Sequence, residues 1–223
     1  MKNITKEFLK ESITIKQKLL DEKYINKIVE AGEIILKAVK NGNKILTCGN
    51  GGSAADAQHF ATELVIRYNK ERPSIPAIAL SSDASVVTAA SNDYGYEFVF
   101  SRQIEGLGKA GDVLIGITTS GNSKNVHKAF ETAKELGMKT ICLNGNSGGT
   151  INNLNLDSNL IIPSNTTARI QEAHINIIHI WCELIDQIIY KVNETNWNHS
   201  GIFKEAHTRS GRYNDWWIYF WEH

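Results

Sequence analysis

Several features that define special classes of protein are scarce or missing here. The 223 residues include only three cysteines, Cys48, Cys142 and Cys182, which lie far apart and form no CxxC pair. Such scattered cysteines exclude a disulfide framework and a cysteine-rich zinc site, and they are typical of free thiols in a reducing compartment. No uncharged apolar run approaches ~18 residues, and the charged amino terminus has no apolar signal segment. We therefore expect a cytoplasmic protein that does not span a membrane.

An excess of charge of either sign is also missing. Lysine and arginine together number 24, aspartate and glutamate together number 24, and the formal net charge is zero. Because no whole-molecule field attracts polyanions, we expect neither nucleic acid nor an anionic membrane as a partner. Hydrophobic residues make up 42% and charged residues 22%, which is the balance of a globular protein. The length suits one domain with at most a small appendage.

Short apolar runs alternate with helical patterns along most of the chain. Runs rich in β-branched residues predict strands at 44–48, 76–80, 112–118, 139–144 and 159–163. Apolar residues at helical spacing predict two helices within 3–40, ended by Gly42, and further helices at 53–68, 83–91, 123–136 and about 168–192. Strands that alternate with helices form βαβ units. The sequence therefore predicts an α/β fold: a three-layer sandwich with a five-stranded parallel sheet and an N-terminal helical pair.

A glycine-rich segment joins the first predicted strand to the helix that follows it. It reads Asn50-Gly51-Gly52-Ser53, and it lies where the carboxyl end of a strand meets a helix N-terminus. Such a place offers free N–H groups and partial positive charge, which suit an anion such as phosphate. The segment matches neither GxGxxG nor GxxxxGK[ST], so a nucleotide is disfavoured. The alternative is a plain turn in which Ser53 caps the helix.

A second polar segment follows the third predicted strand and also precedes a helix. Residues 118–123 contain four hydroxyl side chains, those of Thr118, Thr119, Ser120 and Ser123. Neutral hydroxyl donors can surround a phosphate dianion without lysine, although the same residue types are common in simple turns. Two such segments at the ends of two strands of one sheet indicate a phosphorylated, hydroxyl-rich small molecule.

Two helices carry side chains suited to proton transfer or metal binding. His59 and Glu63 are four residues apart, which places them on one helix face as a general base or as metal ligands. The alternative is a solvated surface pair. Gln171 and His179 lie eight residues apart in an isoleucine-rich helix, on roughly one side of it. Here the alternative is a histidine that is satisfied inside the core.

Four segments, taken together, closely resemble the phosphoheptose isomerases of the sugar isomerase (SIS) fold. They are CGNGGSAADAQHFATEL, SNDYGYEFVFSRQ, GITTSGNSKNV and RIQEAHINIIHI, and they occur in order between about residues 10 and 190. The resemblance implies a single SIS domain over residues 1–192. The aromatic-rich tail at 193–223 falls outside it. That tail is either a segment that contacts a partner or another subunit, or an extension without a selected role.

The resemblance implies an activity. Phosphoheptose isomerases convert sedoheptulose 7-phosphate to D-glycero-D-manno-heptose 7-phosphate through an enediol(ate), which begins the synthesis of ADP- or GDP-heptose precursors for lipopolysaccharide or capsule. It also implies a homotetramer whose active sites are built from neighbouring subunits. Ala168 departs from the family pattern, because some relatives carry a carboxylate at that position. Without it, the sequence does not indicate which residue orients the side chains near position 168.

The resemblance also implies roles for individual residues. Glu63 and His179 match the acid/base pair. One zinc ion per subunit is implied at His59, Glu63, Gln171 and His179. The implied substrate contacts are Asn50, Gly51, Gly52, Ser53, Glu63, Asn92, Asp93, Thr118, Thr119, Ser120, Ser123 and Gln171.

Two other functions stay open at this point. Some SIS proteins are non-enzymatic adaptors that bind the bacterial replication-initiator protein, but an adaptor has no chemical need for Glu63, Gln171 and His179. The chain is alternatively an isomerase of another sugar phosphate, such as a pentose or hexosamine phosphate. An amino-sugar enzyme of this fold is usually accompanied by a glutamine-hydrolysing domain, for which this chain is too short.

Overall fold

The structure is a computed structural model and describes residues 1–190. The predicted tail at 193–223 lies outside the described residues. Five strands form one parallel sheet in the order β2-β1-β3-β4-β5. The strands are β1 (Ile45–Gly49), β2 (Ala77–Ala79), β3 (Val113–Ile117), β4 (Lys139–Asn144) and β5 (Ser158–Ile161). The five predicted strands are thus confirmed, with bounds that differ by up to two residues.

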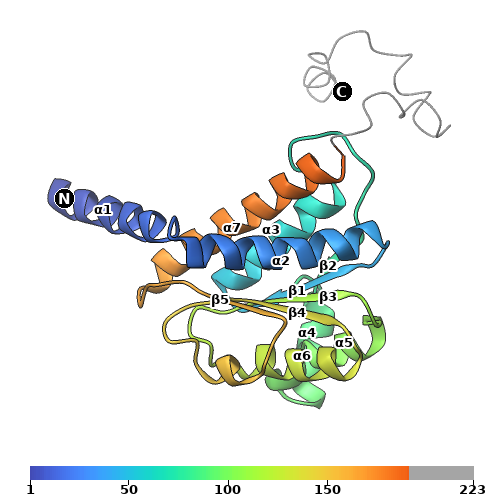
Figure 1. Cartoon of the computed structure of the whole chain (residues 1–223). Coiled ribbons are helices and arrows are strands. Elements are labelled where there is room, and N and C mark those ends of the chain that lie inside the picture. Colours follow the sequence, from blue (N-terminus) through green and yellow to red (C-terminus); the bar gives the residue numbers. More distant parts are fainter. Residues whose placement is uncertain (191–223) are drawn as a thin grey trace, which may run out of the picture.

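Helices cover both faces of the sheet, as Figure 1 shows. The long helices are α1 (Lys2–Lys18), α2 (Glu22–Lys40), α3 (Gly52–Val65), α6 (Lys124–Glu135) and α7 (Thr167–Ile188). The shorter ones are α4 (Ala84–Asp93), α5 (Ser101–Leu107) and two 3₁₀ turns, η1 (Tyr96–Phe98) and η2 (Thr150–Asn153). Helices α2, α3 and α7 lie on one face, and α4, α5 and α6 lie on the other. The predicted three-layer α/β sandwich is confirmed.

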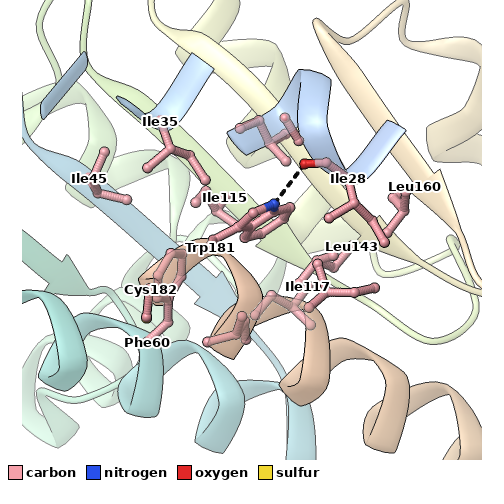
Figure 2. Packing of buried hydrophobic residues seen from close by; sticks show 14 of the residues in the cluster. Ile28, Ile35, Ile45, Phe60, Ile115, Ile117, Leu143, Leu160, Trp181 and Cys182 are labelled. Carbon is pink, nitrogen blue, oxygen red and sulfur yellow. Dashed lines mark hydrogen bonds between the residues drawn. The ribbon is translucent and has the colours of Figure 1, made fainter. Parts of the chain in front are cut away.

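The two core clusters follow from the strand pleat. All five residues of β1 are buried, and alternate side chains point to opposite faces, so Ile45 joins one cluster while Leu46 joins the other. Figure 2 shows the first cluster, in which Trp181 of α7 packs between the sheet and α2. The Trp181 indole N–H donates to the backbone carbonyl of Ile28 at 3.0 Å, which satisfies its one polar atom inside the core.

The N-terminal pair, α1 and α2, is present as predicted. Gly42, with a φ of +73°, follows the last turn of α2 and permits the left-handed stop. In Figure 1, α1 projects away from the rest of the domain and is held at one end of α7. Ser12 donates to the Glu172 carboxylate at 2.6 Å, and Arg169 donates to the Phe8 carbonyl at 2.8 Å.

Two local predictions differ from the structure. The helix predicted at 53–68 ends at Val65, where the Arg72 guanidinium donates hydrogen bonds to the backbone carbonyls of Glu63 and Leu64 in the last turn. The short helix α5 has no counterpart in the prediction, since seven residues carry too little periodicity to reveal it. Within residues 1–190, no helix combines the length and the apolar character needed to cross a bilayer.

Candidate active site

The glycine-rich segment turns sharply between β1 and α3. Gly51 has a φ of +55°, a conformation that L side chains rarely adopt, and it precedes the first residue of α3. Ser53 does not cap this helix: its side chain is buried within the first turn, and its backbone N–H donates to the Asn50 carbonyl at 3.0 Å. The alternative of a turn capped by Ser53 is therefore wrong.

A pair of amide side chains ties the two polar segments together. Asn50 and Asn125, the latter in the first turn of α6, exchange hydrogen bonds of 2.9 and 2.8 Å. The Tyr96 hydroxyl donates to the same Asn50 oxygen at 2.9 Å. A pocket of about 480 Å³ opens beside this tie and is also lined by Ser123. Asn125 is buried, and no pattern in the sequence indicated its contact with Asn50, although it lies two residues beyond Ser123.

Hydroxyl groups of residues 118–123 also organise their own loop. The Thr118 and Ser123 hydroxyl oxygens lie 3.1 Å apart, and the Gly121 N–H donates to Thr118 at 3.2 Å. Ser120 accepts from the Asn122 N–H at 3.2 Å. The loop is thus preorganised ahead of the α6 N-terminus, where free N–H groups favour an anion.

Gln171 brings α7 against the start of α3. A Cβ atom on Gly52 would lie only 2.3 Å from the Gln171 amide nitrogen, so the absence of a side chain at Gly52 lets this amide lie directly against the start of α3. The predicted Gly52 and Gln171 are therefore direct neighbours, although 119 positions separate them in the chain.

Three of the predicted catalytic or metal-binding side chains meet about two turns further along both helices. The Nε2 atom of His59 lies 3.0 Å from Nε2 of His179 and 3.3 Å from Oε1 of Glu63. The ring of Tyr68 stacks on His179 with centroids 5.6 Å apart. Tyr68 lies beyond the end of α3, so no helical spacing linked it to His179.

The donor atoms of this cluster are suited to zinc, which binds imidazole nitrogen and carboxylate oxygen. A tetrahedral ion with Zn–N bonds of 2.0–2.1 Å holds two nitrogens about 3.3 Å apart. His59 and His179 face each other 0.3 Å closer than that, at 3.0 Å, which is hydrogen-bond distance. Among residues 1–190, no group of three His, Cys, Asp or Glu side chains is arranged as a formed metal centre. The three side chains are thus donors of the kind that zinc binds, and the spacing of their two imidazole nitrogens is within 0.3 Å of that around a tetrahedral ion.

Asp56 adds an unusual carboxyl group to the same helix. It lies one turn before His59, and its Oδ2 is buried without a hydrogen-bond partner among the described residues. Burial raises the pKa of Asp56 to about 6, against the opposing effect of His59. No pattern in the sequence singles out this residue, because a carboxylate near a helix start is ordinary.

Asn92 and Asp93 stand apart from the other predicted residues. They end α4 on the opposite face of the sheet, are exposed, and form a mutual hydrogen bond of 2.8 Å. In the part of the chain that the structure describes, no hydrogen bond or ion pair joins them to Glu63, Gln171 or His179. The structure thus brings Gly52 to Gln171, and His59 to Glu63 and His179. It leaves the predicted pair at the end of α4 separate from both.

The matches to known families agree with this geometry. SIS domain families match residues 7–145 and residues 100–191. The chain is therefore a SIS-domain protein, with a parallel sheet and polar loops at the carboxyl ends of β1 and β3.

Individual relatives narrow the class. The phosphoheptose isomerase of Campylobacter jejuni is 57% identical over 173 residues, which cover 77% of this chain and 92% of that protein. The structure of the Neisseria gonorrhoeae phosphoheptose isomerase is 45% identical, with a TM-score of 0.78 over 84% of this chain and 99% of that one. That of Francisella tularensis is 40% identical, with a TM-score of 0.80 over 83% and 97%. The chain belongs to the phosphoheptose isomerase family.

Proposed function

We propose that this enzyme interconverts sedoheptulose 7-phosphate and D-glycero-D-manno-heptose 7-phosphate. The family supports a sugar-phosphate isomerase, and one observation supports the acid/base site: His59 Nε2 contacts both Glu63 and His179. A carboxylate on α3 and an imidazole on α7 are thereby brought together through His59. Isomerisation needs such a pair, because a proton must leave carbon while another reaches oxygen.

In this proposal, Glu63 moves the carbon-bound proton. The Glu63 carboxylate removes a proton from C1 of the open-chain ketose, and the electron pair forms the C1–C2 double bond of the enediol. The C2 oxygen gains a proton, for which His179 is the donor. Glu63 then returns its proton to C2 as the C1 hydroxyl loses its own to His179, so C1 is oxidised and C2 is reduced with no external oxidant.

The far phosphate is proposed to bind at residues 118–123. Thr119, Ser120 and Ser123 bring hydroxyl groups there, and the α6 N-terminus adds partial positive charge. Binding energy gathered at the phosphate orients the distant reacting carbons. Asn50 acts here mainly by tying this loop to the start of α3, because its side chain is engaged by Asn125 and Tyr96.

Zinc is part of the proposal, with His59, Glu63, Gln171 and His179 as its ligands. When bound, zinc would polarise the sugar carbonyl as a Lewis acid. The four side chains come from α3 and α7 alone, so the packing of these two helices controls the site.

We also propose a cytoplasmic homotetramer. The proposed subunit interface includes the apolar surface of α1, where Ile4, Leu9 and Ile13 are each more than half exposed. Large exposed apolar groups along one projecting helix favour association with another copy. The three free cysteines, all buried, suit a reducing compartment.

The deciding experiment is coupled turnover of the purified chain with ketose phosphates of five, six and seven carbons. We expect the seven-carbon substrate to give the highest kcat/KM. A preference for a shorter substrate would replace the heptose assignment with another sugar phosphate. Failure to turn over any of the three, by folded and zinc-loaded protein, would refute the isomerase proposal.

A further inference from the structure

A buried ion pair lies at the far end of the two helices that carry the cluster. The Arg72 Nε donates to Oδ1 of Asp186 at 3.0 Å, and each side chain is only 1% exposed. Arg72 belongs to the segment between α3 and β2, whereas Asp186 belongs to α7. Removing two charges from water is costly, and the attraction between them offsets this cost only where the geometry is good and further hydrogen bonds satisfy both groups.

Arg72 holds the last turn of α3. Its Nη2 donates to the backbone carbonyl of Glu63 at 2.6 Å, and its Nη1 donates to that of Leu64 at 2.8 Å. The last carbonyl groups of a helix have no partner within it, and a cation there is favourable. Arg72 is therefore in contact with the backbone of the proposed base itself.

Asp186 holds the other side of the same junction. Its Oδ2 accepts from the backbone N–H groups of Asn69 and Lys70, each at 3.0 Å. With Arg72, three donors converge on this one carboxylate. Asp186 also lies seven residues after His179 on α7, about two turns along the same side. The pair thus joins the end of α3 to the helix that carries the proposed acid.

We propose that Arg72 and Asp186 are positioning residues for the isomerisation. They lock the last turn of α3 against α7, and this sets the spacing of Glu63, His59 and His179. The inference rests on the proposed roles of Glu63 and His179. It predicts a loss of catalysis at the reacting end of the substrate. The proposed phosphate-binding loop, residues 118–123, lies between β3 and α6 and is not part of the Arg72–Asp186 junction.

The test substitutes Arg72→Lys, Asp186→Asn and Asp186→Glu in the full chain. Lysine keeps the charge but loses the planar fork that reaches two carbonyl groups and a carboxylate together. Because a misplacement of about 1 Å can cost ~10²-fold, we expect kcat to fall by about that factor. KM for the sugar phosphate should stay within about threefold, and Asp186→Glu, which keeps the charge, should recover more activity than Asp186→Asn.

The chain contains a matched control at the amino ends of the inner strands β1 and β3. Asp112 is also buried; it pairs with the Lys44 ammonium and accepts from two backbone N–H groups, those of Lys44 and Lys109, at 3.0 and 2.9 Å. Asp112→Asn removes a comparable buried pair whose hydrogen bonds involve neither α3 nor α7. We expect it to lower the unfolding midpoint while leaving kcat within about twofold.

Each result decides the proposal. Arg72→Lys and Asp186→Glu with kcat within threefold of the parent would overturn it, and so would an equal loss of kcat in Asp112→Asn. If Asp186→Asn does not fold, Arg72→Lys and Asp186→Glu still give the comparison. Glu63→Gln, measured alongside, distinguishes failure of the proposed base from failure of the positioning role. Full activity of Glu63→Gln refutes Glu63 as the base. An inactive Glu63→Gln together with a fully active Arg72→Lys refutes only the positioning role.

Discussion

The Nε2 atom of His59 lies 3.0 Å from the Nε2 atom of His179, so α3 and α7 meet through two imidazole rings. The same His59 atom lies 3.3 Å from the Glu63 carboxylate. A neutral imidazole has one N–H and one acceptor nitrogen, so a single hydrogen on Nε2 cannot serve both contacts fully. While both rings are neutral, at most one of the two contacts of His59 Nε2 is therefore a full hydrogen bond.

Replacement of Glu63 by glutamine tests the proposed base. The amide keeps the size of the side chain but cannot take a proton from carbon. We expect kcat for sedoheptulose 7-phosphate to fall by about 10²- to 10⁴-fold. Circular dichroism and the unfolding midpoint should match those of the parent, because Glu63 is partly exposed and makes no other ion pair among residues 1–190. Turnover near that of the parent would exclude Glu63 as the base.

Removal of one imidazole tests the proposed zinc ligands. We expect the parent chain to retain about one zinc per subunit after dialysis, and His59→Ala to retain much less, as measured by elemental analysis. His127→Ala is the matched control, because His127 and Glu131 have the same four-residue spacing on α6, with a 3.7 Å separation. Equal zinc content in the two variants would contradict the assigned ligand set.

Charge on the projecting helix tests the proposed assembly. Leu9→Asp with Ile13→Asp places two carboxylates on the exposed apolar side of α1. We expect the mass in sedimentation equilibrium to shift from four subunits toward smaller species, because burying unpaired charges at an interface is unfavourable. Lys16→Asp, at an exposed position without apolar surface, is the control. A tetramer that survives the double substitution would place the interface elsewhere.

The sheet could be predicted because its inner strands, β1, β3 and β4, are buried on both faces. Continuous apolar runs such as Val113–Ile117 mark central parallel strands without any tertiary information, and the alternation with helices then determines the layers. Helix ends were less predictable. The end of α3 depends on Arg72, which lies outside the helix and follows no helical period.

The site could be predicted only in pieces. The strand–loop–helix order revealed both polar loops, and the spacing within α3 paired His59 with Glu63. The contact between His59 and His179 joins residues 120 positions apart, so local spacing could not reveal it and only the family resemblance implied it. Asn125 and Tyr68 act through contacts of the same long-range kind, and no pattern in the sequence singles them out.

Stability should fall in mild acid because of His174. This ring is fully buried, its Nε2–H donates to the Asn144 carbonyl at 2.9 Å, and burial lowers its pKa from 6.5 to about 4. The unfolded chain therefore binds a proton between pH 6.5 and 4 that the folded chain does not. Stability present above pH 6.5 is lost as the pH falls toward 4, by about 3 kcal/mol. Urea unfolding across this range should show the slope, and His174→Gln should flatten it.

Asp56 should affect stability in the opposite direction. Its pKa is raised from 3.8 to about 6 by burial, so the folded state disfavours the carboxylate. The group leaves stability intact below about pH 4 and lowers it as the pH rises through 6. The full shift corresponds to about 3 kcal/mol, and partial solvent access reduces this to the order of 1 kcal/mol. We therefore expect Asp56→Asn to raise the melting temperature at pH 7.5 by about 2–4 °C and to leave it unchanged at pH 4. The exposed Glu33→Gln is the control, and a stabilisation by Asp56→Asn that is equal at both pH values would show that removal of the charge is not its cause.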